Sequence, residues 1–180
     1  KIDRVDCFFT ALHVGGKSVH LPQEERNMRL YLVQHGEATP KQQDPQRPLT
    51  EQGRRNCRSS GSFLQSRGVR LSTIWHSGKL RASQTARIFA EATGGGTVEE
   101  KSGLGPNDPL DSIKTTLENT AEDVMIVGHL PHLNRLASVL TTGDQDADTV
   151  AFRNDGVVCL ECGPDEKWRL AWMVPPELLK

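Results

Sequence analysis

Short apolar segments that each stop at polar residues and a glycine set the tightest limit on how this chain can fold. Three of them occupy residues 30–33, 71–76 and 123–127, and each is predicted to be a buried strand. Helical patterns lie between and after them. Strands that alternate with helices predict a mainly parallel sheet with helices on both faces. We therefore predict an α/β fold, a three-layer sandwich in a single domain.

The predicted helices are defined by their ends and by the spacing of their apolar residues. Thr50 is a good N-cap for a helix that extends to about Arg67, before Gly68. A second helix begins near Leu80, and a third near Pro131, a residue that suits a first helical turn. The spacing i, i+3, i+4, i+7 is met by Ala82, Thr85, Ala86 and Phe89, and by Leu133, Leu136, Ala137 and Leu140. A weaker stripe, Leu110, Ile113 and Leu117, predicts a further helix.

The sequence predicts secondary structure near the C-terminal end of the chain but not for its first 27 residues. Residues 157–161 and 168–174 flank a Gly-Pro-Asp turn, which favours a β-hairpin or two edge strands that close the sheet. The first 27 residues contain no clear periodic element and end just before Met28. We expect residues 1–27 to be a leader or an extended segment that could be flexible. The domain itself is predicted to cover residues 28–180.

The charge balance limits the kinds of partner. The chain of 180 residues carries 22 Lys and Arg against 23 Asp and Glu, so its overall charge does not suggest nucleic acid or an anionic membrane as a partner. No apolar run approaches the roughly 20 residues of a membrane-spanning helix, and no secretory signal is evident. We expect a cytoplasmic protein without nucleic-acid or membrane partners. The oligomeric state is left open.

The cysteines do not indicate a metal or redox centre. Four cysteines in a chain of this size do not resemble a disulfide framework, which fits a reducing compartment. Cys159 and Cys162 form a Cys-x-x-Cys pair, but no second pair supports a zinc site. On a strand, a spacing of three directs the two side chains to opposite faces. We therefore expect two buried or edge thiols.

The chemically useful residues gather where the predicted strands end. They are Gln34 and His35 after the first strand, Ser77 and Arg81 after the second, and His129 after a later one. Carboxyl ends of parallel strands share one edge, where open α/β sheets bind ligands. Taken alone, His35 could equally be a histidine that is hydrogen-bonded in a turn. Two histidines and two arginines, Arg81 and Arg47, suit phosphoryl transfer, because an imidazole can attack phosphorus while cations hold the equatorial oxygens.

Longer motifs surround these residues. They are Gln34-His35-Gly36, Arg47-Pro48-Leu49-Thr50, the stretch Ser77-Gly78-Lys79-Leu80-Arg81-Ala82-Ser83-Gln84-Thr85-Ala86, and Val127-Gly128-His129-Leu130-Pro131. They resemble the motifs of the histidine phosphatase superfamily, also called the phosphoglycerate mutase-like superfamily, over Met28 to roughly Leu140. The resemblance implies a phosphoglycerate mutase-like fold and catalysis without a metal or another cofactor.

The resemblance also implies roles for single residues. His35 would be the phosphorylated nucleophile, Arg81 a phosphate ligand and His129 the second histidine of the site, while Arg47 matches the family's Arg-Pro-Leu-Thr loop. Gln34 departs from the pattern, because the family has arginine there. A charge-assisted hydrogen bond contributes about 1.5–3 kcal/mol and a neutral one about 1 kcal/mol. We therefore expect Gln34 to bind phosphate more weakly than arginine would, or to slow turnover.

Within the superfamily, the short chain and the Gly-His-Leu-Pro segment look most like the SixA-type phosphohistidine phosphatases. That likeness implies a phosphorylated signalling or phosphotransfer protein as substrate. The alternatives are a phosphatase for small phosphate esters and a non-catalytic phosphate-binding protein, the latter because of Gln34. Asp108 is the one candidate for an acidic proton donor, although it is more simply the N-cap of the following helix. Phosphohistidine needs no dedicated acid, because its ring can be protonated near neutral pH and leave as neutral imidazole.

Overall fold

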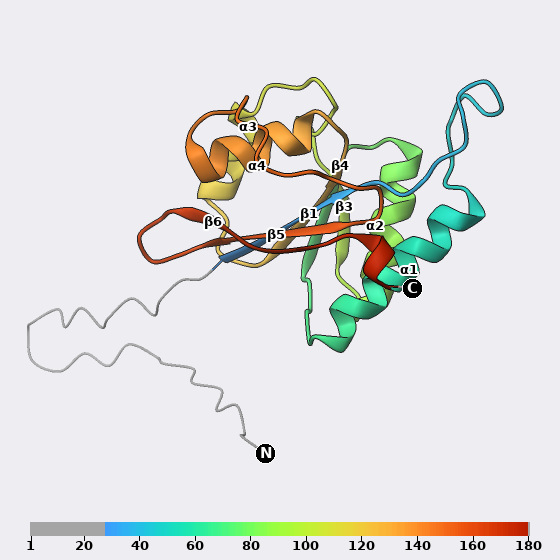
Figure 1. Cartoon of the computed structure of the whole chain (residues 1–180), viewed down its shortest axis with the longest axis horizontal. Coiled ribbons are helices and arrows are strands. Elements are labelled where there is room, and N and C mark those ends of the chain that lie inside the picture. The colour runs from blue at the N-terminus through green and yellow to red at the C-terminus, as the bar shows by residue number, and fades with distance from the viewer. Residues whose placement is uncertain (1–27, 180) are drawn as a thin grey trace, which may run out of the picture.

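A computed structural model describes residues 28–179, which form a central sheet with helices packed against it (Figure 1). In chain order the elements are β1 Met28–Gln34, α1 Glu51–Ser66, β2 Thr73–His76, α2 Leu80–Ala92, β3 Thr97–Glu100, α3 Asp111–Glu118, β4 Val124–Gly128, α4 His132–Thr142, β5 Val157–Cys162, β6 Trp168–Val174 and the 3₁₀ helix η1 Pro176–Leu179. The leader or extended segment predicted for residues 1–27 lies outside the described residues.

The sheet has six strands in the order β3-β2-β4-β1-β5-β6. The first four in this order run parallel to one another, and β5 and β6 pair as the antiparallel hairpin predicted from the sequence. Gln34 of β1 lies opposite Gly128 of β4, and His76 of β2 lies opposite Val127. The residues that follow these three neighbouring strands therefore leave the sheet side by side along one edge.

The middle strand β1 sends alternate side chains into two hydrophobic cores. Leu30 and Leu32 belong to the core beneath α3 and α4, whereas Tyr31 and Val33 belong to the core beneath α1 and α2. These four side chains are almost fully buried, and each of the three aliphatic ones contributes about 1.5–3 kcal/mol by leaving water. The predicted three-layer α/β sandwich is confirmed (Figure 1). Because a slip of one residue would exchange the two faces, this packing fixes the register of β1.

Most helix ends agree with the sequence prediction, and one does not. The Thr50 hydroxyl accepts the N–H of Gly53 at 3.0 Å, as expected of an N-cap. The prediction that Asp108 caps the next helix is wrong, since α3 begins at Asp111 after Leu110. The Asp108 carboxylate instead accepts the N–H of Gly105 at 2.8 Å. The carboxylate that was expected to cap the helix is therefore hydrogen-bonded within the turn that precedes it.

The structure also shows where the cysteines of the Cys-x-x-Cys pair lie, and whether the described residues include a metal-binding group or a membrane-spanning helix. Cys159 belongs to the α1–α2 core and Cys162 packs against the α3–α4 core, so the two side chains point to opposite faces, as their spacing predicts. Among residues 28–179, no group of three or more His, Cys, Asp or Glu is arranged to hold a metal ion. In the same part of the chain, no helix has the length and apolarity needed to cross a membrane.

Candidate active site

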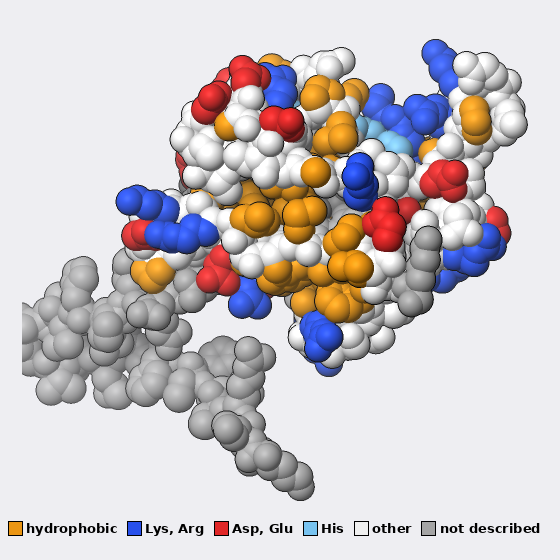
Figure 2. Space-filling view, in the orientation of Figure 1, with side chains coloured by type: hydrophobic (Ala, Val, Ile, Leu, Met, Phe, Trp, Pro, Cys, Tyr) orange, Lys and Arg blue, Asp and Glu red, His pale blue; other side chains and the backbone are white. Residues whose placement is uncertain are grey.

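Three strand ends bring two histidines and an arginine together. His35 follows β1, His129 follows β4, and Arg81 lies in the first turn of α2, just after β2. The N–H of His35 donates to the carbonyl oxygen of Gly128 at 3.1 Å, which ties the two strand ends. The ring centroids of His35 and His129 are 4.9 Å apart. Figure 2 shows histidine side chains at the surface beside a group of Lys and Arg side chains.

Arg81 contacts both imidazoles and thereby reveals which nitrogens carry protons. Its Nε lies 2.9 Å from Nε2 of His35, and its Nη2 lies 3.4 Å from Nδ1 of His129. A guanidinium group can only donate hydrogen bonds. The two nitrogens that face Arg81 must therefore present lone pairs, so the protons of the neutral rings lie on Nδ1 of His35 and Nε2 of His129.

Both of these protons have acceptors. Nδ1–H of His35 donates to the carbonyl oxygen of Gly36 at 2.7 Å. Nε2–H of His129 donates to the hydroxyl oxygen of Ser77, and the two atoms are 2.6 Å apart. These contacts hold each ring in one tautomer and one orientation. As a result, the lone pair of His35 Nε2 is directed toward Arg81.

The surroundings keep both histidines neutral. Burial lowers the pKa of His35 to about 4, and the charges of Arg81 and Arg47 act in the same direction. Burial also lowers the pKa of His129 to about 3, with further contributions from His35 and Arg81. Since the lone pair of a neutral imidazole is the reactive form, a nucleophilic role for His35 at neutral pH would not require the ring to lose a proton first.

Arg47 approaches this cluster from the loop of residues 39–48, which extends away from the body of the molecule (Figure 1). Its backbone has a φ of 53°, and its Nε donates to the carbonyl oxygen of Thr39 at 3.3 Å. The charge of Arg47 lowers the pKa values of His35 and Arg81, so its guanidinium adds to the positive potential of the site.

Gln34 and Asp108, the other two residues that the sequence analysis considered, lie in different surroundings. Gln34 is half-buried at the end of β1, and its side chain makes no hydrogen bond to another described residue. Asp108 is not among the groups that contact His35 or His129, because its carboxylate is bound to Gly105. Within residues 28–179, neither histidine is hydrogen-bonded to an Asp or Glu side chain.

Sequence reasoning assigned no role to two residues that support this cluster, although both lie in the motif of residues 77–86. The Thr85 hydroxyl accepts the N–H of Gly36 at 3.0 Å and donates to the carbonyl oxygen of Arg81 at 2.8 Å, which joins the turn after β1 to α2. Gln84 accepts the N–H of Leu49 at 2.8 Å. Their spacing in the sequence could have indicated this role, because Gln84 and Thr85 follow Arg81 by three and four positions and therefore lie on the same helix face.

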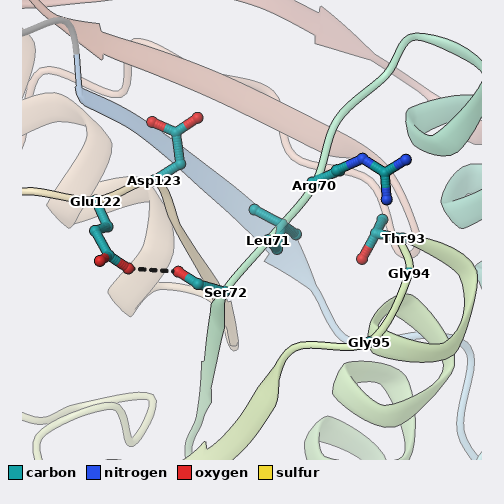
Figure 3. A pocket seen from close by; sticks show the side chains of 8 residues that line it. All are labelled: Arg70, Leu71, Ser72, Thr93, Gly94, Gly95, Glu122 and Asp123. Carbon is teal, nitrogen blue, oxygen red and sulfur yellow. Dashed lines mark hydrogen bonds between the residues drawn. The ribbon is translucent and has the colours of Figure 1, made fainter. Parts of the chain in front are cut away.

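A cavity of about 470 Å³ lies at the opposite edge of the sheet (Figure 3). It is lined by residues that precede β2 and β4, among them Arg70, Ser72, Glu122 and Asp123. The Ser72 hydroxyl donates to Glu122 at 2.7 Å, so part of its polar lining is already paired. The cavity contains no histidine and faces away from the carboxyl ends of the strands, where ligands of open α/β sheets bind.

Comparisons with known proteins identify the family of this chain. Residues 30–105 match the model of the histidine phosphatase superfamily (branch 1). An uncharacterized protein of Picosynechococcus sp. is 32% identical over 143 residues, which cover 76% of this chain and 86% of that protein. The chain therefore belongs to the histidine phosphatase superfamily, and it is a phosphatase of that family.

Solved structures show the same fold. SixA, a protein histidine phosphatase solved with tungstate, superposes with a TM-score of 0.75 at 22% identity, over 85% of this chain and all of SixA. A mycobacterial glucosyl-3-phosphoglycerate phosphatase solved with VO3 gives a TM-score of 0.62 at 16% identity, over 81% of this chain and 98% of that protein. The predicted SixA-like, phosphoglycerate mutase-like fold is thus confirmed.

Proposed function

We propose that this phosphatase transfers a phosphoryl group to His35 and then to water, without a metal ion. The observation that carries the proposal is the contact of Arg81 with the lone pairs of His35 and His129, at 2.9 and 3.4 Å. It combines a neutral imidazole nucleophile, a second imidazole and a guanidinium cation within one cluster. These are the groups that in-line phosphoryl transfer requires.

In the first step, Nε2 of His35 forms a bond to phosphorus while the bond from phosphorus to the leaving group breaks. Nδ1–H remains hydrogen-bonded to the Gly36 carbonyl, which offsets the positive charge that develops on the ring. Arg81 donates to Nε2 in the free protein, so its guanidinium must turn toward the phosphoryl oxygens as the substrate enters. Water then attacks the phosphohistidine, which releases inorganic phosphate and restores His35.

His129 and Arg47 are proposed to hold the transferring group. Nδ1 of His129 faces the same space as the nucleophile, and the negative charge of a phosphoryl group favours protonation of this ring. A protonated His129 can donate to a phosphoryl oxygen through Nδ1 and to Ser77 through Nε2. Arg47 would add positive charge from the loop of residues 39–48, and Gln34 would contribute a neutral amide donor.

The proposed substrate is phosphohistidine on a signalling or phosphotransfer protein. The SixA-like fold supports this choice, as does the absence of any described carboxylate hydrogen-bonded to the two histidines. A phosphate ester expels a poor leaving group and benefits from a positioned acid, whereas a phosphorylated imidazole can be protonated by the solvent. A small phosphate ester is the rival substrate, and no carboxyl group among residues 28–179 is hydrogen-bonded to either histidine as a positioned acid for its leaving group.

Rapid mixing with a phosphorylated substrate tests the proposal. The wild-type protein should form an acid-labile phosphoenzyme that is absent in His35→Ala. The control variant Arg87→Ala, at an exposed position of α2, should behave like wild type. Turnover of a phosphohistidine protein should exceed that of p-nitrophenyl phosphate. The mechanism is refuted if the wild type forms no phosphoenzyme, or if His35→Ala forms it undiminished. The substrate assignment is refuted if the ester is turned over faster.

A further inference from the structure

Helix α1 and the turn after it carry a local excess of positive charge that the overall balance of the chain conceals. Residues 51–70 contain five arginines and one glutamate, a net charge of +4, whereas the whole chain has a net charge of −1. Three of these arginines, Arg54, Arg55 and Arg58, lie on the side of α1 away from its buried residues, and we call them the α1 arginine face. Figure 2 shows Lys and Arg side chains gathered in the region of α1.

Most of the charge of this face is not neutralised within the described part of the chain. There, the side chains of Arg54 and Arg58 form no ion pair and no hydrogen bond with another residue. Arg55 lies 3.9 Å from Oε1 of Glu51 and donates to Oε1 of Gln52 at 2.8 Å. An exposed ion pair of this kind contributes little to stability. The face therefore presents two guanidinium groups that no described carboxylate compensates.

This arrangement does not serve the stability of the helix. Arg54 and Arg58 are four positions apart, and like charges at this spacing repel each other on a helix surface. Cations also favour the C-terminal end of a helix, yet both arginines lie in the first half of α1, and its last turn contains no basic residue. A ligand that brings negative charge to this face would offset both effects.

The α1 arginine face begins beside the candidate active site. The N-cap residue Thr50 donates its N–H to the carbonyl oxygen of Glu37 at 2.9 Å and its hydroxyl to the Glu37 carboxylate, also at 2.9 Å. A Cβ atom added to Gly53 would overlap the same carbonyl oxygen, so the first turn of α1 is packed against the segment that follows His35. Arg54 is the next residue of the helix. A ligand that occupies the site and extends past Glu37 would therefore reach the arginines.

The spacing of the charges favours a macromolecular ligand. Arg54 and Arg58 lie about one helical turn, roughly 5.4 Å, apart and outside the cluster that surrounds His35. Their ligand must therefore carry negative charge beyond the phosphoryl group itself. Nucleic acid and anionic lipid carry such charge, but the rest of the chain has a net charge of −5, the difference between −1 and +4, and would repel an extended polyanion. A compact acidic patch on a protein fits the face better.

We propose that the α1 arginine face is a docking surface for an acidic patch on the phosphorylated substrate protein, next to its phosphohistidine. This inference rests on the proposed function, because it names the partner chemistry of the same site. Opposite charges on two surfaces speed their encounter and fix their relative orientation. Docking therefore lowers the KM for an acidic substrate, while the chemical step at His35 is unchanged.

Phosphohistidine peptides of equal length test this role with the full chain. One peptide has glutamates beside its phosphohistidine, a second has glutamines and a third has lysines. The wild type is compared with Arg54→Gln/Arg58→Gln and with the control Lys167→Gln/Arg169→Gln. The control removes the same charge from exposed residues of the β5–β6 hairpin, at the sheet edge opposite to His35. The measurements are kcat and KM at two ionic strengths, tungstate affinity and urea unfolding.

The wild type should prefer the glutamate peptide, and the preference should shrink at high salt. In Arg54→Gln/Arg58→Gln, kcat/KM for that peptide should fall by about 2- to 30-fold, mainly through KM, the range expected for two exposed charge pairs. Turnover of the glutamine peptide and tungstate affinity should not change, because neither ligand reaches the face with a charge. The free energy of unfolding should stay the same or rise, since a repulsive pair is lost. The control should match the wild type.

The inference is overturned if Arg54→Gln/Arg58→Gln keeps the preference for the glutamate peptide, or if it loses activity equally toward the glutamine peptide. A control that loses the preference to the same extent also overturns it, because the effect then comes from net charge. Tighter binding of phosphatidylserine vesicles or of a single-stranded RNA, dependent on the same two arginines, would assign the face to a membrane or to nucleic acid instead.

Failure of the proposed function would look different. In that case the wild type would dephosphorylate none of the three peptides. Fluorescence anisotropy with the unphosphorylated glutamate peptide then still decides the role of the face, because this measurement does not depend on activity. The wild type must bind that peptide more tightly than Arg54→Gln/Arg58→Gln does, and equal affinities would rule out docking at α1.

Discussion

Replacing Gln34 by arginine should strengthen the binding of phosphate-like oxyanions. Gln34 ends β1 opposite Gly128, on the edge that carries His35, and its amide can offer only a neutral hydrogen bond. A charge-assisted bond contributes about 1.5–3 kcal/mol and a neutral one about 1 kcal/mol. The difference, about 0.5–2 kcal/mol, corresponds to a roughly 2- to 30-fold gain in affinity at 1.36 kcal/mol per factor of ten.

The same substitution should lower the stability of the free protein, because it adds a third guanidinium to the site of Arg81 and Arg47. An oxyanion relieves this repulsion, so the gain in affinity should be larger at low salt than at high salt. Titration calorimetry with tungstate at two ionic strengths measures the effect, and rapid mixing shows whether phosphoenzyme formation accelerates as well. Gln65→Arg, an exposed position in the last turn of α1, is the matched control for net charge.

Two outcomes would refute this reasoning. If Gln34→Arg leaves both tungstate affinity and phosphorylation rate unchanged, a positive charge at the end of β1 has no role in holding the oxyanion. If Gln65→Arg produces an equal gain, the effect comes from the overall charge of the protein and not from the site.

Further predictions concern the arginine, the histidines and the nucleophile turn. Arg81→Lys keeps the charge but cannot reach both imidazoles as Arg81 does, so single-turnover phosphorylation should fall by about 10²–10³-fold, whereas Arg87→Lys on the exposed face of α2 should not matter. The free energy of unfolding should decrease as the pH falls from about 6.5 toward 4, because unfolded histidines take up protons while buried His35 and His129 have pKa values of about 4 and about 3; urea titrations that show no such loss would contradict this. Gly36→Ala should destabilise the protein by about 1–3 kcal/mol, since the new Cβ would overlap the carboxylate and thiol behind it, and a wild-type urea midpoint would argue against that packing.

Much of the fold could be predicted because local signals agreed with it. The cap at Thr50, the apolar face of α2 and the buried run of β1 each point to the element that forms. The end of the loop before α3 could not be predicted in the same way. Asp108 has the chemistry of an N-cap, but whether its carboxylate turns forward to a helix or back to Gly105 depends on the loop's own geometry.

Part of the candidate site could be predicted from the sequence, and part of it could not. Parallel strand ends and motif spacing were enough to group His35, Arg81 and His129, and the structure places these three side chains in contact. The packing of the Asp155 carboxylate behind Gly36 could not be predicted, because an Asp-Gly pair before a strand predicts only a turn. Its proximity to Gly36 arises from antiparallel pairing of β5 with β1, a contact between residues more than 100 positions apart.

The hydrogen bond from Arg81 to Nε2 of His35 has a consequence for selectivity. The nucleophile's lone pair is covered by a cation until a ligand offers that cation a better acceptor. An anionic phosphoryl group does so, while a neutral electrophile of similar size does not. If His35 is the nucleophile as proposed, uncharged reagents should react slowly with its Nε2 in the free protein, and the charge of the substrate would itself expose that atom.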